Sequence, residues 1–185
     1  MRRPILGFGL AFVAVTALLT VSAAAAGEPA HAYIGADKCK MCHNSPAKGA
    51  QYTKWSESAH AKAYTVLASD EAKKIATEKG IADPQKDDGC LGCHVAGHGA
   101  PAAMLTDKYK VEDGVSCEAC HGPGGDYWKM QVMKDKAQAV AAGLVLPTEA
   151  TCKECHNEKS PTFKGFDFAA AKAKIAHPLT GPAAK

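Results

Sequence analysis

The chain has 185 residues and a formal net charge of +3, and only 6% of its residues are aromatic. This length suits one domain, and the low aromatic content leaves the polypeptide little material for a large apolar core of its own. The near balance of 22 basic and 19 acidic residues excludes the strongly basic surface that a nucleic-acid-binding protein presents.

Residues 1–26 have the organisation of a secretory signal peptide. Two arginines precede an apolar run over residues 5–21, and small residues lead from there to Ala26. Since the run is short for a membrane span and the small residues follow it directly, we expect cleavage after Ala26 rather than a retained membrane anchor. Residues 27–185 then form a single exported domain without stable membrane insertion.

The pattern Cys-x-x-Cys-His follows, and it occurs four times, starting at residues 39, 90, 117 and 152. These segments, motifs one to four, use all eight cysteines of the chain. The pattern is the attachment signature of c-type haem, because two thiolates one helical turn apart reach both vinyl groups of one porphyrin and the next histidine binds its iron. Zinc ribbons and disulfide frameworks also use paired cysteines, but neither needs a histidine after each pair.

The sequence therefore predicts four covalently bound haem c groups, one at each motif. The thioether bonds are expected at eight cysteines: Cys39, Cys42, Cys90, Cys93, Cys117, Cys120, Cys152 and Cys155. The irons are expected to take one ligand each from the histidines that close the motifs: His43, His94, His121 and His156. The cytochrome c maturation machinery is accordingly a predicted partner.

Short helices are expected between the first three motifs. Residues 46–80 show apolar residues at helical spacing with breaks, and Ser69 marks a fresh helix start that Gly80 stops. Residues 95–114 are rich in glycine, proline and small residues. They predict a loop with a small hairpin around residues 109–111.

Further helices are expected in the last third of the chain. Asp126, which follows motif three, is expected to cap a helix that runs to about Ala142. Pro147 opens a short helix that carries motif four, and a last helix is expected from Asp167 to Ala176.

The predicted fold class is mainly α, with short helices and long loops wrapped around four closely packed haems. Four porphyrins would supply the large apolar bodies that the polypeptide lacks, so the haem-free chain should be largely unfolded. Motifs two and three begin closest together along the chain, at residues 90 and 117. We therefore expect their two haems to lie in near contact.

The ligand on the second face of each iron decides the chemistry. Two imidazoles occupy both axial positions of the iron and keep its reduction potential low. A methionine in place of one imidazole raises the reduction potential, and an iron with one unoccupied face can bind small molecules. Four histidines remain outside the motifs: His31, His60, His98 and His177. Four spare histidines for four haems favour ligation by two histidines at each iron.

Two of these histidines are the better placed as second ligands. His60 lies on the helical stretch that follows Trp55, and His177 ends a predicted helix next to Pro178, which restricts the local backbone. The alternative to iron ligation is that each of them is an ordinary surface histidine.

The remaining candidates leave more than one possibility open. His31 lies near the predicted mature N-terminus and can ligate a haem of its own chain or of a neighbouring molecule. His98 lies four residues beyond His94, too near to cross to the far face of the same haem, so it would serve another one. Met133, on the helix after motif three, competes with it, although helix packing also explains a methionine there.

Several segments of the chain together resemble the cytochrome c-554 family. They are Tyr33–Cys39 with Cys42 and His43; Trp55, Ser58 and His60–Ala63; Cys93–Val95 with Gly97; Gly114 and Val115 with Cys117 and Glu118; Cys120–Gly124; Ser160–Phe163; and Lys174–Pro178. The resemblance implies a mainly helical fold with closely stacked haems and electron transfer in the periplasm. It also implies that His60 and His177 are second iron ligands.

The chain departs from that family in two places, and the first is His98, which stands where relatives often carry an aromatic residue. Relatives often have a further histidine shortly after the Gly-Pro-Gly turn, where this chain has Tyr127, Trp128 and Gln131. One iron is therefore left to His98, Met133, His31 or no protein ligand.

The function predicted from these observations is a periplasmic electron carrier, not an enzyme, in which electrons hop from haem to haem. Periplasmic or membrane redox proteins are the expected partners, with no nucleic acid, and the oligomeric state stays open. Attachment to the cell surface is an alternative location. Two alternative functions remain: a haem enzyme with one open iron that acts on a small nitrogen compound, and a subunit of a haem wire in which His31 binds the next protomer's haem.

Overall fold

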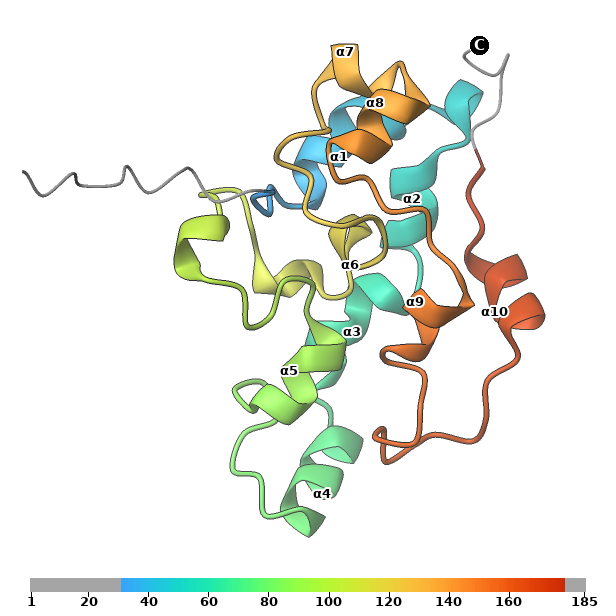
Figure 1. The fold of residues 1–185 in the computed structure, drawn as a ribbon. Coiled ribbons are helices and arrows are strands. Elements are labelled where there is room, and N and C mark those ends of the chain that lie inside the picture. Colours follow the sequence, from blue (N-terminus) through green and yellow to red (C-terminus); the bar gives the residue numbers. More distant parts are fainter. Residues whose placement is uncertain (1–30, 179–185) are drawn as a thin grey trace, which may run out of the picture.

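The computed structural model describes residues 31–178, so the predicted signal peptide lies outside the described residues. Within them, the secondary structure consists of ten short α-helices and four 3₁₀ turns, and the only strand-like pairing is an isolated bridge between Tyr33 and Leu105. Figure 1 shows these helices separated by long loops. The predicted fold class, mainly α with short helices and loops, is confirmed.

The first part of the chain descends along one side of the molecule, from α1 at the top to α4 at the bottom in Figure 1. The helices in order are α1 (Ala36–His43), η1 (Pro46–Lys48), α2 (Gln51–Ser56), η2 (His60–Lys62), α3 (Ala63–Val66) and α4 (Asp70–Glu78). The start predicted at Ser69 is confirmed, since its side chain accepts a hydrogen bond from the Ala72 N–H at 3.2 Å. Gly80 follows the helix with a φ of +70°, which stops it as predicted.

The middle of the chain contains α5 (Asp88–His94), η3 (Ala102–Met104), η4 (Val111–Asp113) and α6 (Cys117–His121). The hairpin expected around residues 109–111 is wrong. The strand-like pairing lies a few residues earlier, where the Tyr33 N–H donates to the Met104 carbonyl and the Thr106 N–H donates to the Tyr33 carbonyl. This part of the chain therefore pairs with a distant backbone segment rather than with its own neighbours.

The last part contains α7 (Met130–Met133), α8 (Lys136–Ala141), α9 (Glu149–Lys153) and α10 (Phe168–Ile175). The single helix expected between Asp126 and Ala142 is wrong, because the chain forms two short helices with a break at Asp135. The Asp135 carboxylate accepts hydrogen bonds from two backbone N–H groups of α8 and starts a new helix there. The other two starts agree with the prediction, with Thr148 and Asp167 at the N-caps of α9 and α10.

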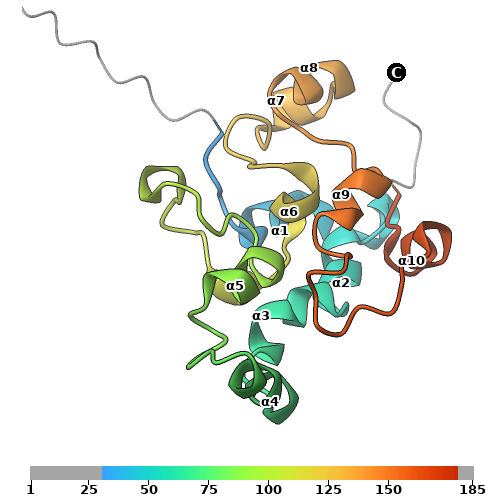
Figure 2. The ribbon, with the colours of Figure 1, turned by 60° about the horizontal axis from the view of Figure 1, so that its bottom comes forward.

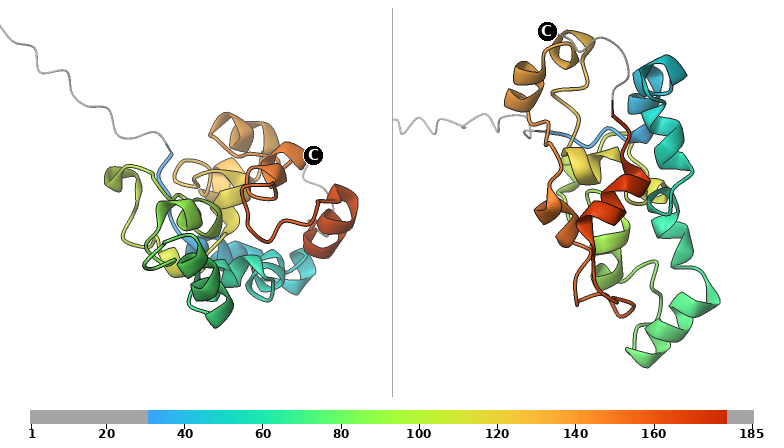
Figure 3. Two further views of the ribbon diagram at one scale, coloured as in Figure 1. Left: turned by 90° about the horizontal axis from the view of Figure 1, so that it is seen from below. Right: turned by 90° about the vertical axis from the view of Figure 1, so that its right-hand side faces the viewer.

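The ends of the molecule are occupied by different helices. Helices α7 and α8 lie at one end and α4 lies at the other, as Figure 2 and the right-hand view of Figure 3 show. Between them lie α1, α6 and α9, which carry all or part of three of the four motifs. The motifs therefore gather in the middle of the fold.

The polypeptide buries little large apolar surface of its own. The buried apolar residues are Ile34, Ala36, Ala63, Leu67, Ala76, Val95, Ala96, Tyr127 and Ala139, and no described residue with a large side chain is completely buried. Five of these nine are alanines, whose burial stabilises a fold only slightly. Such an interior is consistent with a fold organised around bound groups rather than around side-chain packing.

A buried carboxylate joins the N-terminal segment to α6. Glu118 is only 3% exposed, and its oxygens accept hydrogen bonds from the N–H groups of Ile34, Gly35 and Gly124 at 2.7–2.9 Å. Burial raises the pKa of Glu118, although these three N–H groups oppose the shift. This one side chain therefore connects motif three to the segment before motif one and to the Gly-Pro-Gly turn.

Candidate haem sites

Three of the four motifs lie within helices. Motifs one, two and three occupy α1, α5 and α6, so that their two cysteines are one helical turn apart. The N-cap of α5 is Asp87, whose carboxylate accepts the N–H of Cys90 at 3.0 Å. These helices present Cys39 and Cys42, Cys90 and Cys93, and Cys117 and Cys120.

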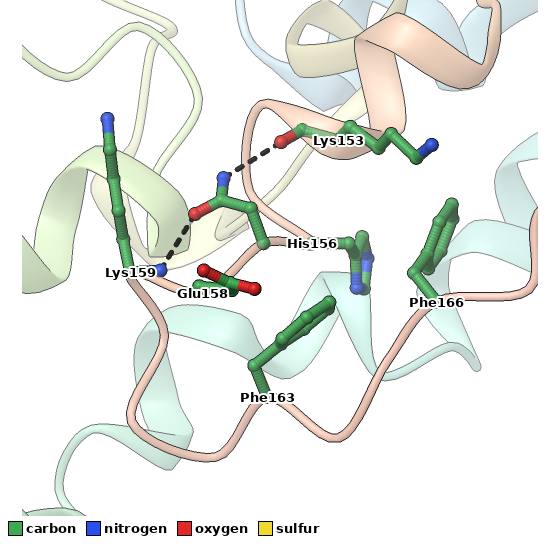
Figure 4. Close-up of a pocket in the computed structure, with 7 residues that line it drawn as sticks. Lys153, His156, Glu158, Lys159, Phe163 and Phe166 are labelled. Carbon is green, nitrogen blue, oxygen red and sulfur yellow. Dashed lines mark hydrogen bonds between the residues drawn. The ribbon is translucent and has the colours of Figure 1, made fainter.

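Motif four is built differently. Helix α9 ends at Lys153, so Cys152 lies in the helix whereas Cys155 and His156 lie in the turn after it. The Asn157 side-chain amide donates hydrogen bonds to the carbonyls of Lys153 and Glu154, both at 2.8 Å, and so satisfies the end of the helix (Figure 4).

The structure brings His60 to the histidine of motif four. The ring centroids of His60, from η2, and His156 lie 6.0 Å apart, with an angle of 73° between the ring planes. Two imidazoles bound end-on to one metal ion, with metal–nitrogen bonds of about 2 Å, have centroids about 6 Å apart. Burial, and to a smaller extent His156, lower the pKa of His60, which favours the neutral imidazole that binds metals.

A second pair has nearly the same geometry. The ring centroids of His121, of motif three, and His177 lie 6.1 Å apart, with the planes at 68°. The Nδ1 atom of His121 lies 3.1 Å from the Val145 carbonyl, and that of His177 lies 2.8 Å from the Ile175 carbonyl. These contacts assign the ring proton to Nδ1 and leave Nε2 for a metal. Burial also lowers the pKa of His121.

A cavity of about 260 Å³ adjoins this second pair. Its apolar walls include Val115, Leu144, Leu146 and Ile175. Iron-binding candidates from motifs one and three and from elsewhere in the chain open onto it: His43, His60, His121, His177 and Met133. The cysteines Cys39, Cys117 and Cys120 also line it. Apolar walls, thiols and imidazoles together fit a covalently bound haem.

Contacts between cysteines show which motifs are neighbours. The Cys39 thiol hydrogen-bonds to that of Cys117, and this contact raises the pKa of Cys39. Burial and the neighbouring Cys93 raise the pKa of Cys155 to about 12. The thiols therefore join motif one to motif three and motif two to motif four.

Burial raises the pKa of Cys120 of motif three, and the charge of Cys152 of motif four adds to this effect without a hydrogen bond between the two thiols being described. The expectation that motifs two and three hold the closest haems relied on distance along the chain. The thiol contacts join other pairs of motifs, but the two ends of the loop between α5 and α6 lie close together, since the Ala96 N–H donates to the Gly114 carbonyl at 2.8 Å. The expectation for motifs two and three therefore stays a prediction.

The other predicted ligands lie in different surroundings. The Nδ1 atom of His94 is 2.6 Å from the Ala63 carbonyl, which leaves its Nε2 for a metal. The remaining two histidines are beside carboxylates: His31 Nδ1 lies 2.7 Å from Asp126, and His98 Nε2 lies 3.1 Å from Asp88. The structure does not place either of them next to a motif histidine among the contacts it describes.

Two aromatic residues at motif four were not singled out from the sequence. The ring of Phe166 stacks on His156, with centroids 4.8 Å apart and planes at 20°. Phe163 lies on the other side of the imidazole and lines an open pocket with Lys153 and Lys159 (Figure 4). The only sequence signal for these contacts is that two aromatic residues follow the motif within ten positions.

None of the helices within residues 31–178 combines the length and apolar character that a membrane span needs.

The sequence of the chain is similar to those of known proteins. The family model described as cytochrome c554 and c-prime matches residues 38–122, which hold motifs one to three. Cytochrome c-554 of Nitrosomonas europaea is 33% identical over 174 residues, which cover 85% of this chain and 70% of that protein. No solved structure matches the chain.

Proposed function

Because the chain belongs to the cytochrome c-554 family, and is therefore a c-type cytochrome that carries electrons, we propose that it binds four haems and transfers electrons among them in the periplasm. The observation that supports this most directly is the pair of imidazole contacts at 6.0 Å and 6.1 Å. Bound haem supplies a one-electron couple of its iron. The protein must supply attachment, axial ligands, burial and spacing.

The chain's own residues perform these tasks at motifs three and four. His121 with His177, and His156 with His60, offer two imidazoles to each iron and so exclude small molecules from it. Carbonyls at Val145 and Ile175 hold the first pair in the tautomer that presents Nε2. Closed, low-spin centres of this kind suit electron transfer rather than substrate chemistry.

The thiol contacts order the attachment sites. Thiol hydrogen bonds connect motif one to motif three and motif four to motif two, and the charge of Cys152 in motif four raises the pKa of Cys120 in motif three. A continuous series of sites in the order one, three, four and two supports the proposal of hopping along the molecule. Motifs one and two then lie at the two ends of the series, where electrons enter and leave.

Location and partners form part of the same proposal. The signal-peptide pattern of residues 1–26 supports export to the periplasm. The near balance of acidic and basic residues supports short-lived docking with periplasmic or membrane redox proteins, since neither sign of charge dominates.

A second candidate function is favoured by motif two. In the described part of the chain, His94 contacts a backbone carbonyl, and the two imidazole pairs belong to motifs three and four. An open iron at motif two would bind a small nitrogen compound, as a haem reductase requires.

Two measurements on the exported protein test the proposal. Mass spectrometry should give the mature chain plus four haems, and electron paramagnetic resonance of the oxidised protein should show at least two low-spin centres with two histidine ligands. A mass with fewer haems, or spectra without such centres, would refute the tetrahaem carrier. Carbon monoxide added to the reduced protein separates the candidates, because no spectral change means no open iron and excludes the reductase.

A further inference from the structure

We propose that Met133 binds the iron of the motif-one haem on the face opposite His43, which makes this haem the highest-potential site and the point where electrons leave the protein. The inference rests on the proposed function and adds to it a ligand set and a direction of electron transfer.

The first step is that each of the four histidines outside the motifs already has another contact partner. His177 pairs with His121, and His60 pairs with His156. His31 and His98 lie against carboxylates, at 2.7 Å and 3.1 Å. His43 therefore has no histidine partner among the contacts described for residues 31–178, whereas His121, which lines the same cavity, does.

The second step is the position of Met133. This side chain and His43 line the same cavity. Helix α7, which carries Met133, approaches α1, since Lys38 Nζ of α1 lies 4.9 Å from the ring centroid of Trp128, two residues before α7. Met130, one turn earlier in α7, is 60% exposed, so α7 directs one methionine into the cavity and leaves the other at the surface.

The third step compares Met133 with one other donor in the cavity wall. The Tyr127 hydroxyl donates a hydrogen bond to the Gly122 carbonyl at 2.6 Å, and burial raises its pKa, so it stays a neutral phenol with its proton committed. The Met133 thioether is neutral and polarizable, and it needs no deprotonation to bind haem iron.

The direction of electron transfer follows from the ligand set. Methionine in place of the second histidine raises the reduction potential of a haem. Motif one adjoins motif three, since Cys39 and His43 line the same cavity as Cys117 and His121. Electrons that enter elsewhere would therefore collect at motif one before they pass to an acceptor. Met41, within motif one, is 66% exposed, so this site lies at the surface.

The test uses the holoprotein and the variants Met133→Leu and Met133→His, with Met130→Leu as the matched control. The oxidised wild type should show the weak near-infrared charge-transfer band of a sulfur–iron(III) bond. Met133→Leu should lose this band, gain a high-spin signal and bind carbon monoxide at one more haem than the wild type. Met133→His should also lose the band, stay low-spin and lower the highest of the haem potentials, while Met130→Leu should change none of these properties.

The outcomes separate this inference from the function on which it rests. If the wild type has four haems and low-spin centres with two histidines but lacks the sulfur–iron band, the Met133 assignment is wrong and the carrier function stands. The assignment is equally wrong if Met133→Leu keeps the band. A protein without four haems overturns the proposed function itself, and this result is visible by mass before any variant is made.

Discussion

Replacement of Glu118 by glutamine is expected to destabilise the holoprotein by about 2–3 kcal/mol. Oε1 of Glu118 accepts the N–H groups of Ile34 and Gly124, and Oε2 accepts that of Gly35 at 2.9 Å. Glutamine keeps one oxygen and turns an NH₂ group towards the third donor, so one buried N–H loses its acceptor. A hydrogen bond to a charged group contributes about 1.5–3 kcal/mol, and an unsatisfied buried group costs about 1–3 kcal/mol. Removal of a buried charge, whose pKa burial raises, offsets part of this loss.

The assay is guanidinium unfolding of the haem-loaded protein at neutral pH, followed by far-ultraviolet circular dichroism. Glu112→Gln is the matched control, since Glu112 is exposed in η4 and loses the same charge without a buried partner. It should change the free energy of unfolding by no more than about 0.5 kcal/mol. Equal effects of the two substitutions would show that charge alone matters, and the role assigned to the Glu118 hydrogen bonds would be wrong.

Three further results are expected. His60→Ala should convert one low-spin haem to high-spin in electron paramagnetic resonance, whereas His98→Ala should leave the low-spin signals unchanged; an unaltered His60→Ala spectrum would refute the pairing with motif four. Phe166→Leu should shift the g values and the potential of one haem, because its ring orients the His156 imidazole. Phe168→Leu serves as the control, because the ring contact described for the half-buried Phe168 is with Lys172 Nζ, 5.6 Å from its centroid. The chain produced without haem attachment should be largely unfolded by circular dichroism, and a compact helical apoprotein would contradict the view that the haems form its interior.

The sequence predicted correctly those helix starts that depend only on neighbouring residues. The starts at Ser69, Thr148 and Asp167 were predicted correctly because an N-cap depends on a side chain and on backbone groups two or three residues away. The hairpin near residues 109–111 was wrong because the nearby strand-like pairing joins Met104 and Thr106 to the distant Tyr33. The single helix after Asp126 was wrong because the Asp126 carboxylate contacts the distant His31 and because Asp135 starts a new helix.

The same distinction applies to the haem sites. The sequence by itself determined the attachment chemistry, since each motif places two thiols and an imidazole within five consecutive residues and no tertiary contact is needed to bring them together. Only the tertiary structure decided which second imidazole meets which motif, and which motifs are neighbours. His60 lies in η2 and His156 lies in the turn after α9, and several helices and loops separate these two positions along the chain. Spacing along a chain does not set distances between elements that loops join, because packing and long-range hydrogen bonds select among the many arrangements that such loops allow.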